Sequence, residues 1–157
     1  MVEPPVKLER PDPIDPRAIA GAAEVYHLAA MISVPESVAK PAECAELNTE
    51  GTRRVLDAAL AAGARKVVLA SSAAIYGDNP AVPKLESMPP EPKSPYAETK
   101  LAGEQLLAQY RQAHGLGTTS LRFFNVFGPR QDPRSAYAAA VPIFIAKALR
   151  DEPIGIH

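Results

Sequence analysis

Apolar positions along the chain follow two different periods. Short apolar runs occupy residues 24–30 and 66–70, and a third strand candidate lies at residues 118–124. The second run is unbroken, which is typical of a buried strand in a parallel sheet. Residues 48–62 and 96–114 instead place apolar side chains three or four positions apart, which predicts two amphipathic helices. Strands that alternate with helices of this length favour an α/β fold built from parallel βαβ units.

Prolines interrupt this pattern in two places. The chain has 17 prolines in 157 residues, about twice the ~5% share of average proteins. Five of them fall within the first sixteen residues, so residues 1–20 are predicted to form an irregular arm with at most a short edge strand at residues 6–9. Six more lie between residues 80 and 95, which indicates an irregular surface loop.

Charge and composition exclude several classes of protein. Lysine and arginine number 17 against 18 aspartate and glutamate residues, so the chain lacks the positive excess that binding to nucleic acid requires. No apolar run approaches the roughly 20 residues of a membrane span, and the N-terminus has no apolar signal segment, which predicts a cytoplasmic protein. Cys44 is the only cysteine, so no disulfide can form within the chain. The three histidines show no ligand spacing, and no metal is expected.

Three unusual segments follow predicted strands or open a predicted helix. They are SSAAIYG at residues 71–77, SPYAETK at residues 94–100 and NVFGPRQ at residues 125–131. Ligands of open parallel sheets bind beyond the carboxyl ends of the strands. These segments are therefore the first candidates for a functional site.

Tyr96 and Lys100 are four residues apart on a predicted helix, so both side chains lie on one face. A tyrosine with its ordinary pKa of ~10 is a weak base at neutral pH. A neighbouring ammonium stabilises the phenolate and makes proton exchange with a substrate hydroxyl feasible. Ser72, at the end of a neighbouring strand, is suited to hold the same substrate oxygen by a hydrogen bond. The Tyr-x-x-x-Lys spacing is weak evidence alone, and its position after the strand-Ser-Ser segment strengthens it.

The order of these motifs resembles that of the extended short-chain dehydrogenase/reductases, and among them the NAD-dependent sugar-nucleotide epimerases and dehydratases. The resemblance covers nearly the whole chain and is carried by the segments HLAA, SVPESV, NTEGT, SSAAIYGD, SPYAETK and LRFFNVFGPRQDP. Residues 76–86 and 130–144 look most like the UDP-glucose and UDP-N-acetylglucosamine 4-epimerases.

The resemblance implies a partial Rossmann-like fold, that is, a doubly wound parallel sheet with flanking helices. It divides the chain into the proline-rich arm (residues 1–20), a partial NAD-binding domain (residues 21–128) and the start of a substrate-binding region (residues 129–157). None of the nine glycines forms the G-x-G-x-x-G turn with which the family binds pyrophosphate, so the chain is expected to be a truncated part of the enzyme. Without the strand that precedes such a turn, residues 24–30 become a sheet edge, which predicts self-association through that edge.

The resemblance also implies roles for individual residues. Tyr96 is expected to exchange the proton of the sugar 4-hydroxyl, with Lys100 as its neighbouring cation and Ser72 as hydrogen-bond donor to the 4-oxygen. A hydride then passes from C4 to tightly held NAD and returns to the other face of the 4-keto sugar. The residues expected to contact the cofactor are Ala29, Ala30, Asn48, Ser71, Tyr96, Lys100 and Phe124. Those expected to contact the nucleotide sugar are Ser72, Asn125 and Arg130.

The implied partners are a UDP-hexose or a UDP-N-acetylhexosamine and, in the intact enzyme, a second copy of the protein packed through the helices at residues 48–62 and 96–114. No nucleic acid and no membrane partner is expected. Dehydratase and decarboxylase relatives share the Tyr and Lys, although a dehydratase needs an acidic pair where Ala73 and Ala74 stand.

Other interpretations stay open. The chain could be a non-catalytic remnant that acts as a structural or interaction piece. Each candidate residue also has a purely structural alternative: a turn cap for Ser71 or Ser72, a helix N-cap for Asn48, core packing for Phe124, a turn for Asn125 and a solvated loop for Arg130.

Overall fold

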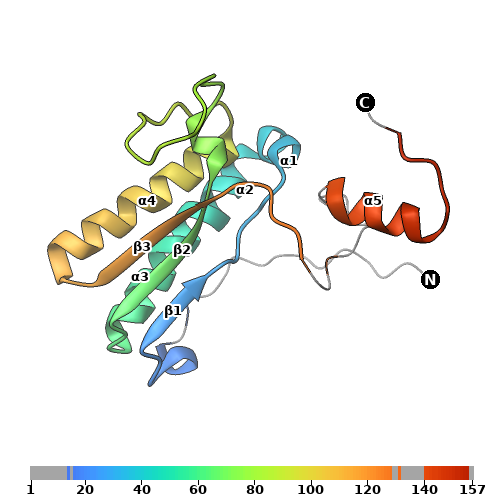
Figure 1. Cartoon of the computed structure of the whole chain (residues 1–157). Coiled ribbons are helices and arrows are strands. Elements are labelled where there is room, and N and C mark those ends of the chain that lie inside the picture. The colour runs from blue at the N-terminus through green and yellow to red at the C-terminus, as the bar shows by residue number, and fades with distance from the viewer. Residues whose placement is uncertain (1–13, 15, 129–130, 132–139, 156–157) are drawn as a thin grey trace. The chain divides into compact units, whose positions relative to one another are not determined.

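The computed structural model describes residue 14 and residues 16–128, 131 and 140–155 (Figure 1). The chain forms two compact units, Met1–Arg122 and Phe123–His157, and each is described by itself. The predicted edge strand at residues 6–9 and the candidate Arg130 lie outside the described residues.

A parallel sheet with strand order β1-β2-β3 is the centre of the fold (Figure 1). Its strands are β1 (Glu24–His27), β2 (Lys66–Ser72) and β3 (Gly117–Phe123). β1 and β2 pair in parallel, with Tyr26 beside Val68 and His27 beside Leu69. The predicted α/β class and its parallel sheet are confirmed.

β1 ends earlier than the apolar run predicts, at His27 rather than at Ala30. The backbone N–H and C=O of Met31 are instead hydrogen-bonded to the side chain of Asn48, at 2.7 and 3.0 Å. Buried backbone groups need partners, and here an amide side chain takes the place of a neighbouring strand. The chain therefore leaves the sheet after His27 and turns toward the helices.

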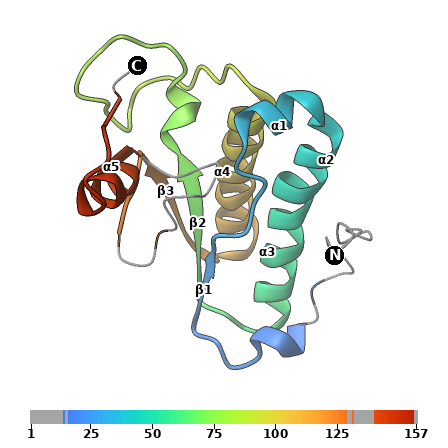
Figure 2. The same ribbon diagram turned by 90° about the vertical axis from the view of Figure 1, so that its right-hand side faces the viewer.

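The two long helical stretches cover one face of the sheet (Figure 2). The helical elements of the first unit are η1 (Pro16–Ile19), α1 (Val34–Ala39), α2 (Pro41–Ala45), η2 (Glu46–Glu50), α3 (Gly51–Ala61), η3 (Ala73–Tyr76) and α4 (Pro95–His114). α2, η2 and α3 follow one another without a break, and η2 between them is a π-helical segment.

The predicted helix at residues 48–62 is only the second part of this stretch, which already begins at Pro41. The earlier part was missed because α2 and η2, with five residues each, are too short to show an apolar period. The helix predicted at residues 96–114 is confirmed and includes Pro95 as well.

The ends of α4 follow from its sequence. The Ser94 hydroxyl accepts a hydrogen bond from the N–H of Ala97 at 3.2 Å, and Pro95 occupies the first turn, where its missing N–H costs nothing. Gly115 ends the helix with a φ of +70°, a left-handed conformation that favours glycine. The position of Tyr96 in the first turn is thus fixed by the residues around it.

The core of the first unit lies between the sheet and the helices α3 and α4. Burying this apolar surface is the main favourable term for the fold. Its buried members are Leu56, Ala59, Ala64, Val67, Leu69, Leu106, Leu107 and Leu116.

The second unit contains α5 (Ala140–Leu149), which the sequence analysis does not predict. Phe124 and Asn125 also belong to this unit. Across the described part of the chain, no helix combines the length and apolar character needed to cross a membrane.

Candidate functional site

The segment that follows β1 is held by a chain of buried side chains. The Thr52 hydroxyl donates to the C=O of Asn48 at 2.6 Å, so its one proton is engaged and it accepts a hydrogen bond from Nε2 of His27 at 3.1 Å. Burial, together with the positive charge of Lys100, lowers the pKa of His27. A neutral imidazole therefore stands at the end of β1.

Asn48 is the centre of this arrangement and is only 3% exposed. Besides its two bonds to Met31, its side-chain amide donates to the hydroxyl of Thr99 at 3.0 Å. Thr99 lies on α4, so the side chain of Asn48 joins the segment after β1 to both long helical stretches. Asn48 lies within η2 and not at the start of a helix, which excludes the alternative interpretation as an N-cap.

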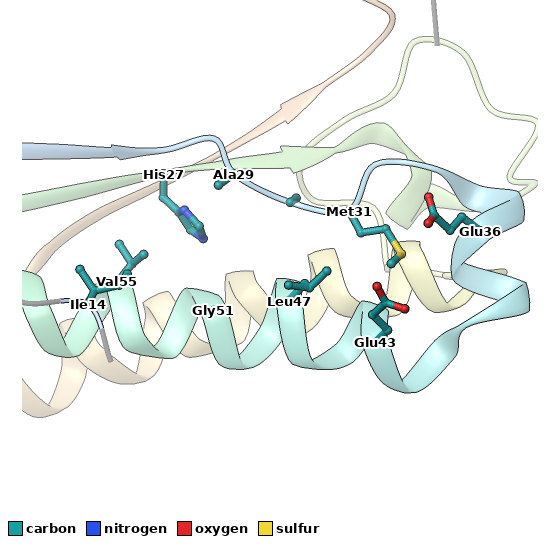
Figure 3. Close-up of a pocket in the computed structure, with 10 residues that line it drawn as sticks. Ile14, His27, Ala29, Met31, Glu36, Glu43, Leu47, Gly51 and Val55 are labelled. Atoms are coloured by element: carbon teal, nitrogen blue, oxygen red, sulfur yellow. The ribbon is translucent and has the colours of Figure 1, made fainter. Parts of the chain in front are cut away.

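A cavity of about 480 Å³ opens between this segment and the helical stretch (Figure 3). His27 points into it from the end of β1, and Gly51 on the facing helix has no side chain to fill it. Glu36 and Glu43 also line it, and both pair with Lys40, at 3.7 and 3.2 Å. The remaining lining residues are Ile14, Ala29, Ala30, Met31, Leu47 and Val55.

Tyr96 is held at the start of α4 by residues from two other parts of the chain. Its backbone N–H donates to the hydroxyl of Ser37, a completely buried residue of α1, at 3.1 Å. Its C=O accepts from the hydroxyl of Thr99 at 2.8 Å. The tyrosine ring is half-buried, so it remains accessible to a ligand.

Lys100 lies one turn further along α4 and is 6% exposed. Its Nζ donates to the C=O of Ala70 at 2.9 Å and lies 5.6 Å from the centroid of the Tyr96 ring. Burial lowers the pKa of this ammonium. The structure thus brings the predicted Tyr96 and Lys100 together on one face of the helix.

α4 can bring Lys100 this close to β2 because Gly103 faces the strand. A Cβ atom at this position would lie 2.9 Å from Cδ2 of Leu69. Glycine thus permits the close approach of helix and sheet.

The two serines at the end of β2 have different partners. Ser71 is buried, and its hydroxyl donates to Oε1 of Glu104 at 2.5 Å. The Ser72 hydroxyl accepts from the N–H of Ala74 at 3.1 Å and so caps η3. Because accepting leaves the hydroxyl proton free, the capping role of Ser72 is compatible with donation to a substrate oxygen.

A sequence profile of the NAD dependent epimerase/dehydratase family matches residues 14–157. The chain belongs to this family. This match confirms the family that the order of sequence motifs predicts, which is a family of enzymes.

Individual members of the family are also similar. A UDP-glucose 4-epimerase of Mycolicibacterium smegmatis is 48% identical over 121 residues, which are 76% of this chain and 38% of that protein. The solved UDP-N-acetylglucosamine 4-epimerase from Methanobrevibacter ruminantium M1, in complex with UDP-N-acetylmuramic acid, superimposes with a TM-score of 0.83 at 40% identity, over 90% of this chain and 46% of that one.

The solved UDP-glucose 4-epimerase of Thermus thermophilus, in complex with NAD, gives a TM-score of 0.76 at 41% identity over 88% of this chain and 46% of that one. The chain spans less than half the length of these three relatives.

Of the predicted site residues, Ser71 and Ser72 lie at the end of β2, Tyr96 and Lys100 lie in the first turns of α4, and Ala29 and Ala30 line the cavity. Asn48 does not line the cavity but is hydrogen-bonded to Met31, which does. Phe124 and Asn125 lie in the second unit, and Arg130 lies outside the described residues. The catalytic and binding roles of all these residues stay predictions.

Four residues of the site region were missed: Ser37, Thr99, Glu104 and Arg122. Only Glu104 had a usable signal, since it lies four positions after Lys100 and therefore on the same helix face.

Proposed function

We propose that the chain carries the proton-transfer groups of an NAD-dependent 4-epimerase that acts on a UDP-hexose or a UDP-N-acetylhexosamine. The observation that carries this proposal is the buried Lys100 ammonium, held by the C=O of Ala70 beside the ring of Tyr96. A buried cation next to an accessible phenol, with a serine hydroxyl at the neighbouring strand end, is a set of groups for moving a proton to and from a sugar hydroxyl.

Each group has a defined task in this proposal. Tyr96 takes the proton from the sugar 4-hydroxyl and later gives it back. The Lys100 ammonium stabilises the phenolate form of Tyr96, in which the tyrosine oxygen carries the negative charge before it takes the proton. One of its three N–H groups donates to the C=O of Ala70. Ser72 donates its free hydroxyl proton to the 4-oxygen and so fixes the sugar ring.

NAD, when bound, would supply the acceptor for a hydride from C4 of the sugar and would be the source of its return to the opposite face. The cavity beyond β1 suits part of such a dinucleotide, because Ala29, Ala30 and Gly51 allow close approach to the backbone. The carboxylates of Glu36 and Glu43 can accept hydrogen bonds from ribose hydroxyls but would repel phosphates. The cavity therefore fits a nucleoside portion of the cofactor, and the pyrophosphate has to be bound elsewhere.

Epimerisation is favoured over dehydration by the residues after Ser72. Ala73 and Ala74 begin η3 there and offer no acid or base for the elimination of water. The similarity to UDP-sugar 4-epimerases supports the same choice. A homodimer packed through α3 and α4 remains a prediction from the family resemblance, and a cytoplasmic location remains a prediction from the sequence composition.

A non-catalytic role for these 157 residues is the second candidate. It is favoured by the absence of a G-x-G-x-x-G segment from the sequence. In that case the catalytic groups are present but bind no cofactor in the chain alone.

Calorimetric titration of the purified chain with NAD, with and without UDP-glucose, separates the two candidates. Binding in the micromolar range, followed by interconversion of UDP-glucose and UDP-galactose, supports the epimerase. No detectable binding supports the non-catalytic role.

Tyr96→Phe then tests the assignment of the proton-transfer group, because it removes only the hydroxyl. We expect interconversion to fall by roughly 10²- to 10⁴-fold, the usual contribution of a general acid–base group, while NAD affinity changes less than about threefold. Tyr110→Phe is the matched control on the same helix, since the Tyr110 hydroxyl donates to Asp57 at 2.5 Å and is not part of the site. Equal losses in the two variants would contradict the assignment.

A further inference from the structure

The carboxylate of Glu104 joins three elements next to the proposed proton-transfer groups. Glu104 lies on α4, one turn beyond Lys100. Its Oε1 accepts from Ser71 at 2.5 Å and from Nε of Arg122 at 3.0 Å, and its Oε2 accepts from Nη2 of Arg122 at 2.8 Å. The two charged side chains are only 14% and 19% exposed. Through Glu104, α4 is thereby hydrogen-bonded to Ser71 at the end of β2 and paired with Arg122 on β3.

Arg122 extends the same network to the segment after β2. Its Nη1 donates to the hydroxyl of Tyr76 at 3.1 Å and to the C=O of Glu86 at 3.3 Å. Its guanidinium carbon also lies 5.0 Å from the centroid of the Tyr76 ring. Tyr76 is buried and ends η3, so the arginine fixes the C-terminal end of η3 and one point of the loop that follows.

Ser72 stands between the two places that this ion pair fixes. On one side its neighbour Ser71 is bonded to Glu104. On the other side Ser72 itself caps η3, whose last residue is bonded to Arg122. Within the described residues, no hydrogen bond joins this ion pair to Tyr96 or Lys100, so any effect it has on them is transmitted through the positions of Ser72 and α4.

We propose that Glu104 and Arg122 are positioning residues, which hold the Ser72 hydroxyl in register with Tyr96 and Lys100. The proposal rests on the proposed function for its chemistry and on the hydrogen-bond network for its geometry. Groups that transfer protons must be held within a fraction of an ångström of the productive geometry. A bidentate ion pair supplies such constraint better than a single bond, because its planar fork allows one orientation.

Glu104→Gln is the decisive variant, because it keeps the shape of the side chain and removes its charge. In the unliganded chain, we expect the amide hydrogen of Ala74 to exchange at least tenfold faster, since its acceptor Ser72 is no longer held in place. Glu50→Gln is the matched control, because it breaks an exposed ion pair with Arg53 on the helical stretch. An Ala74 amide that exchanges as slowly in Glu104→Gln as in the control overturns the proposal, whether or not the chain is an active epimerase.

A kinetic cycle with Ser72→Ala tests the catalytic part. In the wild-type background we expect Glu104→Gln to lower kcat at least tenfold with KM and NAD affinity changed less than about threefold. In the Ser72→Ala background the same change should lower kcat less than about threefold, because the group being positioned has been removed. Equal losses in both backgrounds indicate a purely structural ion pair and overturn the proposal.

Arg122→Lys keeps the positive charge but cannot make the two parallel hydrogen bonds of the guanidinium to Glu104. We expect this variant to lower kcat less than Glu104→Gln does and to leave KM unchanged. A fall in KM and kcat together with wild-type exchange at Ala74 would contradict the positioning role. If the wild-type chain has no epimerase activity, the proposed function fails, and the exchange experiment still decides whether the ion pair positions Ser72.

Discussion

Asn48→Ala is the substitution that best tests how the segment after β1 is held. The change removes four buried hydrogen bonds: two to the backbone of Met31 at 2.7 and 3.0 Å, one to the hydroxyl of Thr99 at 3.0 Å and a weak one to Sγ of Cys44 at 3.5 Å. A typical intramolecular hydrogen bond contributes about 1 kcal/mol net, and more where its partner is left buried without water. Asn48 is 3% exposed, so the free energy of unfolding should fall by about 3 kcal/mol or more.

The assay is urea denaturation of the purified variant, together with thermal unfolding. For a chain of this size, about 3 kcal/mol corresponds to a decrease in Tm of roughly 6–12 °C. Thr49→Ala is the matched control, because the neighbouring Thr49 is only partly buried and its replacement also removes a short polar side chain. We expect that variant to change the free energy of unfolding by about 0.5 kcal/mol or less.

Asn48→Ala should also change the binding of NAD. The backbone of Met31 is the far end of the segment that contains Ala29 and Ala30, both of which line the cavity. Releasing it should weaken NAD binding at least tenfold at a temperature where the variant remains folded. This account of Asn48 would be refuted if Asn48→Ala had the same urea midpoint of unfolding as the wild type. It would also be refuted if the variant lost stability but bound NAD with wild-type affinity.

Three further substitutions test other parts of the structure. Gly77→Ala should lower the free energy of unfolding by about 1–3 kcal/mol, because Gly77 has a φ of +57° and an added Cβ would collide with the C=O of Glu91. A variant with the wild-type urea midpoint of unfolding would contradict this. Gly51→Ala should instead stabilise the helical stretch by about 0.5–1 kcal/mol, since the nearest atom to an added Cβ is the C=O oxygen of Glu46 at an unstrained 3.9 Å. The same change should weaken NAD binding because Gly51 lines the cavity; urea denaturation and calorimetry of one preparation check both. The lowered pKa of His27 means that the unfolded chain binds a proton more readily, so stability should fall as the pH drops from about 7 through the ordinary histidine pKa of ~6.5. The urea midpoint should therefore change less with pH in His27→Gln than in the wild type. An identical pH dependence in the two proteins would exclude the titration of His27 as the cause.

The sheet and the two long helices could be predicted because their signal is local. The unbroken apolar run of β2 and the apolar face of α4 are each readable within a single segment, and Ser94 and Gly115 mark the helix ends. The end of β1 could not be predicted in the same way. It depends on the amide of Asn48, which is 17 residues from Met31 in sequence.

The candidate site shows the same division. Tyr96 and Lys100 were found because a helix brings residues four positions apart together. The ion pair of Glu104 with Arg122 joins a helix to a strand 18 residues further on, and its pairing depends on how the two elements pack. Charged residues in apolar segments indicate that a partner exists, but the sequence does not say which residue it is.

In the proposed function, cofactor binding and proton transfer depend on two separate attachments of α4. Thr99 connects this helix through Asn48 to the segment that lines the cavity, whereas Glu104 connects it to the end of β2 and to β3. Lys100 lies between these two attachments on the helix, and Tyr96 lies one turn before the first. Loosening the first attachment should therefore affect mainly the affinity for NAD, and loosening the second should affect mainly the rate of proton transfer. Because both attachments act on one helix, removing both should cost more in kcat than the product of the single losses, as α4 would then be free to shift as a whole against β2.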